Sequence, residues 1–198
     1  MLKCDIRKFF ASINHQTLFD ILTRYILDER IVALVVEVVG SFQTDMTLTD
    51  AAAHYSVIHK GLPLGNLTSQ LLVNIYMNEF DQFAKHKLKA KHYIRYADDF
   101  VVLSHDKQWL QQIGRYIALF LREQLKLELH HGKVFIKTFA SGVDFLGWIH
   151  FLDHRVLRTA TKNRMFRAIN AQEGKEETVQ SYFGVDESRQ YKKVMATG

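Results

Sequence analysis

Residues 93–103 read YIRYADDFVVL, and this segment constrains the fold more than any other part of the chain. Two runs rich in β-branched and aromatic residues, 93–96 and 100–103, predict two short strands. Asp98 and Asp99 fall between these runs, where a tight hairpin turn is expected, and Asp is a favourable turn residue. Carboxylates that project from a rigid hairpin suit magnesium, which prefers hard oxygen ligands. Taken alone, the segment also fits an ordinary surface hairpin with a solvated acidic turn.

Two further segments place this hairpin in a wider pattern. Residues 2–6 (LKCDI) predict a strand that carries Asp5 near its end, and residues 61–70 (GLPLGNLTSQ) form a glycine-bracketed loop that leads into a helix. In this order, the three segments resemble motifs A, B and C of the reverse transcriptase palm. Residues 96–99 (YADD) have the signature form of that family.

The resemblance continues through the middle of the chain. Residues 127–133 (LELHHGK) resemble motif D, and residues 142–148 (GVDFLGW) resemble motif E, the primer grip. The resemblance therefore covers about residues 1–150. It implies an α/β (α+β) fold, namely a ferredoxin-like polymerase palm with a mixed or antiparallel sheet and helices on one face.

The remaining secondary structure follows from apolar spacing and from helix caps. Asn14 and Asp106 can each cap a helix, and the apolar residues after them recur at helical spacing. Helices are predicted over 14–26, 31–39, 66–88 and from 106 onward, and strands near 134–138 and within 143–151. We expect a palm over 1–152, with an insertion near 40–60. Residues 153–198 are expected to begin a helical thumb that the end of the chain truncates.

The composition is that of a globular protein and sets few limits on function. Lys and Arg number 26 against 21 Asp and Glu, and the pI of about 9.2 is compatible with nucleic acid without requiring it. The single cysteine, Cys4, excludes an intramolecular disulfide and fits a reducing compartment. No apolar run reaches the ~20 residues that cross a bilayer, and the N-terminus lacks a signal-peptide pattern, so we expect a cytoplasmic protein without membrane contact.

The chain begins almost on its first predicted catalytic strand. We therefore expect upstream residues to be missing, and the fragment alone to be weak or inactive as a polymerase.

Three acids form the predicted catalytic centre. Asp5 and Asp98 are expected to bridge two Mg²⁺ ions, with Mn²⁺ as a substitute, and Asp99 is expected to complete or tune the cluster. The resemblance implies that the carbonyl of Ile6 is a further ligand. Lys133, in motif D, is predicted to protonate the leaving pyrophosphate as a general acid. A solvated surface lysine is the alternative for Lys133.

Four further residues are assigned to the incoming nucleotide by resemblance. Phe10 lies where the family has an aromatic steric gate that selects deoxynucleotides; a core position is the alternative. Gly65 lets the backbone approach a ligand closely. Leu64 stands where retroviral enzymes carry Gln, and Gln70 stands where retroviral and group II intron enzymes carry Pro. Together these two residues resemble the reverse transcriptases of diversity-generating retroelements, which copy a template RNA with errors at adenines and work with a small basic accessory protein.

The second half of the chain gives two further predictions about nucleic acid. Phe145, Leu146 and Gly147 are expected to hold the primer end, although an ordinary core hairpin would look the same. The basic residues between Arg155 and Arg167 are spaced through a predicted helix. They fit either a thumb that follows a nucleic-acid backbone or a solvated helix face.

The predicted function is an RNA-directed DNA polymerase that uses an RNA template, a DNA or RNA primer and deoxynucleoside triphosphates. A group II intron-type or host-defence reverse transcriptase is the alternative within the same chemistry. A non-catalytic RNA-binding module on the same fold is the alternative from another class, and a template-independent terminal transferase also stays open. The presence of all three acids favours a polymerase.

Overall fold

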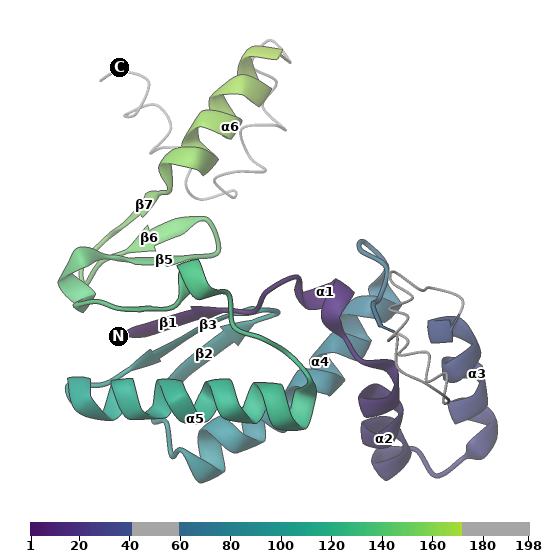
Figure 1. Cartoon of the computed structure of the whole chain (residues 1–198). Coiled ribbons are helices and arrows are strands. Elements are labelled where there is room, and N and C mark those ends of the chain that lie inside the picture. Colours follow the sequence, from purple (N-terminus) through teal and green to yellow (C-terminus); the bar gives the residue numbers. More distant parts are fainter. Residues whose placement is uncertain (41–59, 172–198) are drawn as a thin grey trace, which may run out of the picture. The chain divides into compact units, whose positions relative to one another are not determined.

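The computed structural model describes residues 1–40 and 60–171 (Figure 1). The predicted insertion near 40–60 and the end of the predicted thumb lie outside these residues. The chain divides into two compact units, residues 1–137 and 138–198, and each is described by itself below.

The first unit is built on a four-stranded antiparallel sheet. Its strands are β1 (Leu2–Asp5), β2 (His92–Tyr96), β3 (Asp99–Leu103) and β4 (Phe135–Ile136), in the order β2-β3-β1-β4. Helices connect β1 to β2 and β3 to β4, while β2 and β3 form a hairpin. This succession and strand order are those of the ferredoxin-like arrangement, so the predicted fold class is confirmed.

The helices of the first unit begin and end near the predicted positions. The Asn14 side chain accepts a hydrogen bond from the Thr17 amide at 2.9 Å, and Asp106 accepts one from the Trp109 amide at 2.9 Å, so both predicted caps are confirmed. The helical elements are α1 (Phe9–Ser12), α2 (His15–Tyr25), α3 (Glu29–Gly40), α4 (Leu67–Gln82), η1 (Phe83–Lys87), α5 (Lys107–Leu125) and η2 (His131–Lys133). The π-helix η1 continues α4 and ends close to the predicted end of this helix at 88; the short helices α1 and η2 were not predicted.

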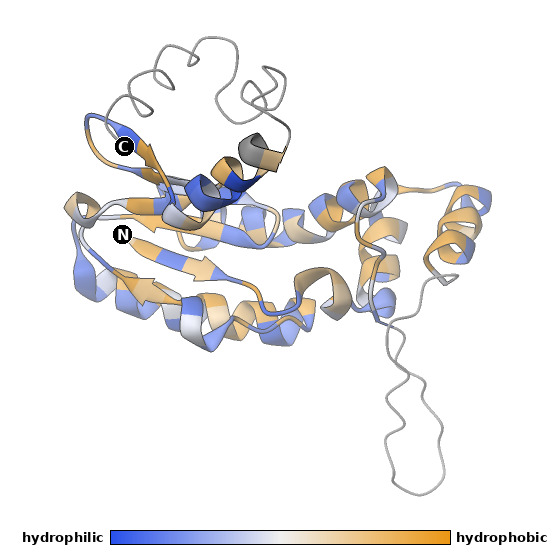
Figure 2. Ribbon diagram, turned by 90° about the horizontal axis from the view of Figure 1, so that it is seen from above, coloured by the Kyte–Doolittle hydropathy of each residue, from blue (hydrophilic) through white to orange (hydrophobic). Residues whose placement is uncertain are grey.

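One face of the sheet forms the core. Successive strand residues point to opposite faces, and the buried side chains of Leu2, Cys4, Phe100 and Val102 all pack in one cluster with apolar residues of α4 and α5. Both helices lie on the same side of the sheet (Figure 1), and apolar positions alternate with polar ones along them (Figure 2). The other face of β1 and β3 carries Lys3, Asp5 and Asp99, together with the buried Val101.

The second unit contains a three-stranded antiparallel sheet and one described helix. Its elements are η3 (Phe139–Ser141), β5 (Val143–Phe145), β6 (Trp148–His150), β7 (Arg155–Leu157) and α6 (Thr159–Ala171). The hairpin predicted within 143–151 is confirmed.

The prediction that a helix includes Arg155 and Arg158 is wrong. Arg155 lies in β7, where it pairs with His150 of β6 and places its guanidinium 4.6 Å from the centre of the Trp148 ring. Strand pairing and this cation–π contact stabilise the segment as a strand. The helical spacing of the basic residues does not reveal either contact. The helix begins only after Arg158, at Thr159.

None of the described helices is both long and apolar enough to cross a bilayer.

Candidate active site

The acids lie at one end of the sheet of the first unit. Asp5 is the last residue of β1 and pairs directly with Asp99, the first residue of β3. Asp98 lies in the turn between β2 and β3, and its carbonyl accepts a hydrogen bond from the Ile6 amide at 3.1 Å. The strand register therefore gathers Asp5, Asp98 and Asp99 at the end of two neighbouring strands. The Ile6 side chain is buried, so only its backbone is available to this end of the sheet.

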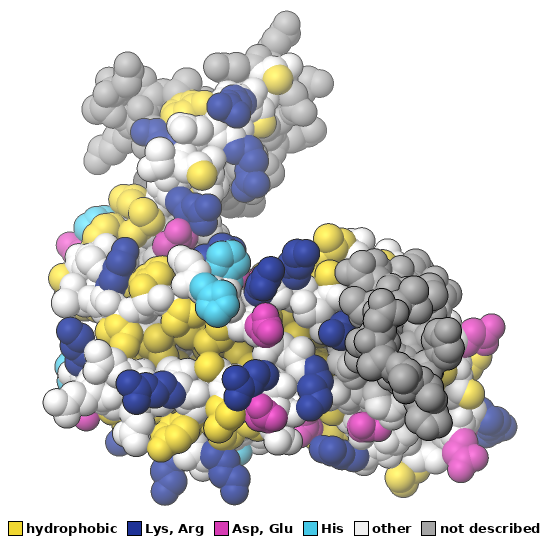
Figure 3. Space-filling model, viewed as in Figure 1, with side chains coloured by type: hydrophobic (Ala, Val, Ile, Leu, Met, Phe, Trp, Pro, Cys, Tyr) yellow, Lys and Arg dark blue, Asp and Glu magenta, His cyan; other side chains and the backbone are white. Residues whose placement is uncertain are grey.

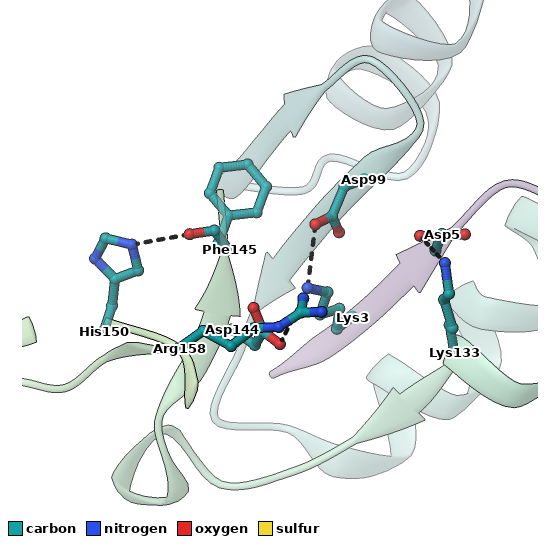
Figure 4. Close-up of polar contacts among 8 residues, drawn as sticks. All are labelled: Lys3, Asp5, Asp99, Lys133, Asp144, Phe145, His150 and Arg158. Carbon is teal, nitrogen blue, oxygen red and sulfur yellow. Dashed lines mark hydrogen bonds and ion pairs between the residues drawn. The ribbon is translucent and has the colours of Figure 1, made fainter. Parts of the chain in front are cut away.

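Two lysines contact these carboxylates (Figure 4). The Lys133 ammonium lies 3.0 Å from Asp5 Oδ2, and the Lys3 ammonium lies 3.1 Å from Asp99 Oδ2. The Lys3 side chain is 10% exposed, whereas that of Lys133 is 56% exposed. The sequence argument selected Lys133 but missed Lys3. The available signal was spacing, because Lys3 lies two residues before Asp5 and so shares its face of the strand.

Two of the carboxylates, those of Asp98 and Asp99, are held in an environment that disfavours their charge. Burial raises the pKa of Asp98, and the charge of Asp5 raises it further, although Lys133 acts in the opposite direction. Burial also raises the pKa of Asp99; Lys3 opposes this effect, and the charges of Asp5 and Asp98 add to it. The net result is a raised pKa for both acids, with burial as the largest cause and the neighbouring carboxylates as a further one.

One feature of the acids fits a cation. The buried oxygen Oδ1 of Asp99 has no hydrogen-bond partner, although buried carboxylate oxygens ordinarily have one. An all-carboxylate donor set is also the kind that Mg²⁺ prefers. In the part of the chain that the structure describes, no group of three or more Asp, Glu, His or Cys side chains is already arranged to hold a metal ion. The acids therefore suit Mg²⁺ in chemistry, and binding would require their side chains to reorient.

The position of Phe10 leaves both of its predicted roles open. Phe9 is buried in the core, whereas Phe10 is half-buried and meets the Phe9 ring edge-on at 5.4 Å between ring centres. The carbonyl of Phe10 accepts a hydrogen bond from the Leu62 amide at 2.9 Å. The structure thus joins the segment after Asp5 to the glycine-bracketed loop.

The glycine-bracketed loop is buried at Leu62 and exposed from Leu64 onward. Gly61 and Gly65 have φ values of 101° and 89°, a region that side chains other than glycine rarely adopt. Leu62 is buried, but the Leu64 side chain is 78% exposed and Gln70 is exposed as well. The residues assigned to the nucleotide are therefore accessible, and no buried contact fixes Leu64.

A basic hollow next to motif A was not predicted. Its volume is about 260 Å³, and its lining includes Arg7, Lys8, Lys60 and Lys126, with Glu128 as the single acid. Arg7 and Glu128 lie 3.7 Å apart, and both side chains are more than half exposed. Four cations against one carboxylate suit an anionic group. The signal in the sequence was the pair Arg7-Lys8 directly after Asp5-Ile6.

The predicted primer-grip residues form the β5–β6 hairpin of the second unit. Phe145 is buried, while Leu146 and Gly147 make the turn with φ values of 54° and 81°. The Leu146 side chain is 53% exposed, and the carbonyl of Phe145 lies 3.3 Å from Nε2 of His150 (Figure 4). The turn therefore presents an apolar side chain to its surroundings.

Lys and Arg side chains line the visible face of α6 (Figure 3).

Comparison with known proteins gives a consistent result. The model of the family described as reverse transcriptase (RNA-dependent DNA polymerase) matches residues 1–150. The chain is 26% identical to Protein YkfC of Escherichia coli over 86% of its own length and 50% of that protein. It is 24% identical to the group II intron-encoded protein LtrA of Lactococcus lactis, over 81% of this chain and 35% of that protein. It is 22% identical to the putative COX1/OXI3 intron 2 protein of Saccharomyces cerevisiae, over 74% of this chain and 23% of that protein. The chain thus spans half or less of the length of these relatives.

Proposed function

Because the chain belongs to the reverse transcriptase family, we propose that it is the palm, over 1–152, and the beginning of the thumb, over 153–198, of an RNA-directed DNA polymerase. Its substrates would be a template RNA, a DNA or RNA primer and deoxynucleoside triphosphates. The observation that carries the proposal is the meeting of Asp5, Asp98 and Asp99 at one end of a ferredoxin-like sheet.

The three acids would hold two Mg²⁺ ions, with the Ile6 carbonyl as a further ligand. When bound, these ions lower the cost of charge on the attacking and leaving oxygens of the phosphoryl transfer. Asp5 and Asp98 would be the shared ligands. Oδ2 of Asp99 forms an ion pair with Lys3, and its buried Oδ1 has no hydrogen-bond partner. We therefore assign Asp99 a role in completing and tuning the metal cluster.

Lys133 supports the proposal through its position. Its ammonium lies at the carboxylate of Asp5, which places a proton donor at the catalytic end of the sheet. A lysine there can donate a proton to the leaving pyrophosphate. The Lys133 side chain is more than half exposed, so it could leave Asp5 and contact the substrate if the Asp5 carboxylate bound a metal ion instead.

The nucleotide would be selected by residues around the loop. Phe10 is proposed as the gate against a 2′-hydroxyl, and Gly65 as the point of close backbone approach. Leu64 and Gln70 are proposed to face the nascent pair and the loop's ligand, because Leu64, directly before Gly65, and Gln70, in the first turn of α4, both have exposed side chains. The basic hollow beside motif A supports the binding of phosphate groups near Asp5. Phe145, Leu146 and Gly147 are proposed to hold the primer end.

Two origins for the enzyme are supported by different observations. Leu64 and Gln70 favour a diversity-generating retroelement, in which case a small basic accessory protein is a further partner. The similarity to intron-encoded proteins favours a group II intron-type enzyme. The neighbouring DNA separates the two: a variable repeat with a near-copy template repeat would establish the first, and a surrounding intron would establish the second.

The test of the proposed activity is primer extension by the full-length protein. Poly(rA) primed with oligo(dT) and supplied with dTTP and Mg²⁺ should give templated extension, and omission of the template should abolish it. Extension without template would identify a terminal transferase. RNA binding without any extension would identify a non-catalytic module.

A further inference from the structure

A partly buried ionic network ties the β2–β3 hairpin to helix α4. Asp81, in the last turn of α4, accepts hydrogen bonds from Nε of Arg95 at 2.8 Å, from Nη2 of Arg95 at 2.6 Å and from the Tyr93 hydroxyl at 2.6 Å. The Arg95 side chain is only 8% exposed. Both carboxylate oxygens are engaged by the guanidinium, which is the strong, geometrically specific form of this pair.

The network stays charged at neutral pH. Burial alone would raise the pKa of Asp81, but the hydrogen bonds from Arg95 and Tyr93 and the charge of Arg95 hold that pKa below its usual value. Asp81 therefore remains an anion, and Arg95 keeps both contacts with it. Lysine could not reproduce this arrangement, because its single ammonium lacks the planar fork of arginine.

A third donor of Arg95 reaches into the catalytic turn. Nη1 of Arg95 donates to the carbonyl of Ala97 at 3.1 Å, and Ala97 directly precedes Asp98. Ala97 has a φ of 51°, a left-handed conformation that is unfavourable for alanine. A residue in such a conformation persists only when its surroundings hold it there. Hydrogen bonds to two neighbouring carbonyls hold the turn. Arg95 donates to the Ala97 carbonyl, and the Ile6 amide donates to the Asp98 carbonyl.

We propose that Arg95 is a positioning residue for the polymerase reaction: oriented by Asp81, it fixes the Ala97 carbonyl and thereby sets the place of the Asp98 carboxylate. Arg95 is assigned no contact with substrate or metal. Its catalytic meaning rests on the proposed function, whereas its hold on the turn does not. This separation allows the two to be tested apart.

The first measurement is amide hydrogen exchange on this chain without metal. Arg95→Gln should release the turn, so exchange of the Ile6 amide should quicken by about tenfold or more, the effect of losing a hydrogen bond from a charged donor. The reference is the Leu127 amide, which donates to the Leu121 carbonyl at the end of α5. If Arg95→Gln does not fold, Arg95→Lys replaces it, since it keeps the charge but cannot reach both Asp81 and Ala97 as arginine does.

Two control variants separate positioning from general loss of stability. Tyr93→Phe removes one hydrogen bond from Asp81 and leaves the three donors of Arg95 in place. Tyr76→Phe removes a buried hydrogen bond to the Leu125 carbonyl, away from the hairpin. In both controls the exchange of the Ile6 amide should not quicken more than that of the Leu127 amide.

The second measurement is the response to metal. Mn²⁺, used as the probe, should bind the Arg95→Gln chain several-fold more weakly than the wild type in calorimetric titration. In the full-length enzyme, Arg95→Gln should raise the Mg²⁺ concentration for half-maximal activity and lower kcat by about tenfold or more, with little change in KM for dNTP. Tyr76→Phe should leave the metal response unchanged.

The outcomes separate the two proposals. Equal acceleration of Ile6 and Leu127 in Arg95→Gln, or no acceleration at all, would overturn the positioning role. Selective acceleration of Ile6 with an unchanged Mn²⁺ affinity would also overturn it, provided that Asp98→Asn abolishes the binding seen in the wild type. If Asp98→Asn binds Mn²⁺ as the wild type does, the proposed metal site is wrong, and selective acceleration of Ile6 still establishes the hold of Arg95 on the turn.

Discussion

The acid-bearing end of the sheet and the loop at 61–66 are both assigned to catalysis, yet the fold holds them in different ways. Asp5 and Asp99 have side chains 15% and 22% exposed, and strand pairing and lysine contacts fix both. Leu64, in the loop, is 78% exposed. The acids proposed for the chemistry are thus fixed by the sheet, whereas Leu64, proposed to face the nucleotide, is exposed and can change without unfolding the protein.

The largest effect should follow from a change at the sheet. In the full-length enzyme, Asp98→Asn should lower the rate of primer extension by about a thousandfold or more, equivalent to roughly 4 kcal/mol, because a shared metal ligand is lost. The matched control is Asp106→Asn, since Asp106 caps α5 and asparagine caps a helix equally well. Extension by Asp98→Asn at a rate near that of the wild type would show that the metals are held elsewhere.

A smaller effect on activity is expected from a change at Phe10, whose carbonyl joins the segment after Asp5 to the loop at Leu62. Phe10→Ala should increase the incorporation of ribonucleotides relative to deoxynucleotides by about tenfold or more, because the ring that excludes the 2′-hydroxyl is removed. Phe10→Tyr keeps a ring and should keep the preference. The ratio of kcat/KM for dNTP and rNTP is the measurement. An unchanged ratio in a folded Phe10→Ala protein would assign Phe10 to the core alone.

A change in the loop should alter fidelity but not rate. Leu64 offers shape without a hydrogen bond, so we expect the enzyme to be error-prone. Leu64→Gln should lower misincorporation several-fold, since an oriented hydrogen bond is worth about 0.5–1.5 kcal/mol. Leu67→Gln, at a leucine 82% exposed, is the control. Sequencing of cDNA copied from one adenine-rich template checks this, and equal error spectra for Leu64→Gln and the wild type would contradict it.

The smallest effect concerns stability and its dependence on pH. The raised pKa values of Asp98 and Asp99 mean that the folded chain holds these protons more tightly than the unfolded chain. Their contribution to stability is therefore present at low pH and is lost as pH rises from the unfolded value of about 3.9 through the raised values. Without metal, Asp98→Asn should raise Tm at pH 7.5 by about 2–4 °C.

Mg²⁺ should reverse this penalty. Added Mg²⁺ should raise the Tm of the wild type at pH 7.5, should raise it less at pH 5, and should not raise that of Asp98→Asn. Differential scanning calorimetry at the two pH values is the measurement. A lower metal-free Tm for Asp98→Asn than for the wild type would show that the crowding of charge does not cost stability.

Sequence alone was sufficient for the main strands and helices of the first unit and for their order. The strand at Asp5, the hairpin at Asp98 and Asp99 and the caps at Asn14 and Asp106 are local patterns, and each is confirmed in the structure. These patterns report the period and ends of single elements, which short stretches of sequence determine. The assignment of the acids and of the nucleotide residues to function stays a prediction.

The contacts that position the site could not be predicted in the same way. The Arg95–Asp81 pair joins a strand to a helix 14 residues earlier, and nothing in either segment marks the partner. The spacing of Lys3 to Asp5 shows that they share a face of the strand, but the ion pair of Lys3 with Asp99 depends on the neighbouring strand. Arg155 was placed in a helix because its spacing to later basic residues is helical, and the pairing of β7 with β6 overrode that spacing. Long-range pairing decides such cases, and one sequence does not display it.

The most direct test of the account is to locate Mn²⁺ in the full-length enzyme bound to primer, template and dNTP. Anomalous diffraction should show two Mn²⁺ ions about 3.5–4 Å apart, held by Asp5 and Asp98, with Lys133 released from Asp5. Asp98→Asn should lose at least one of the two. Mn²⁺ bound away from the end of β1, or an Asp5 carboxylate still engaged by Lys133 with substrate in place, would contradict the claim that these acids form the catalytic centre.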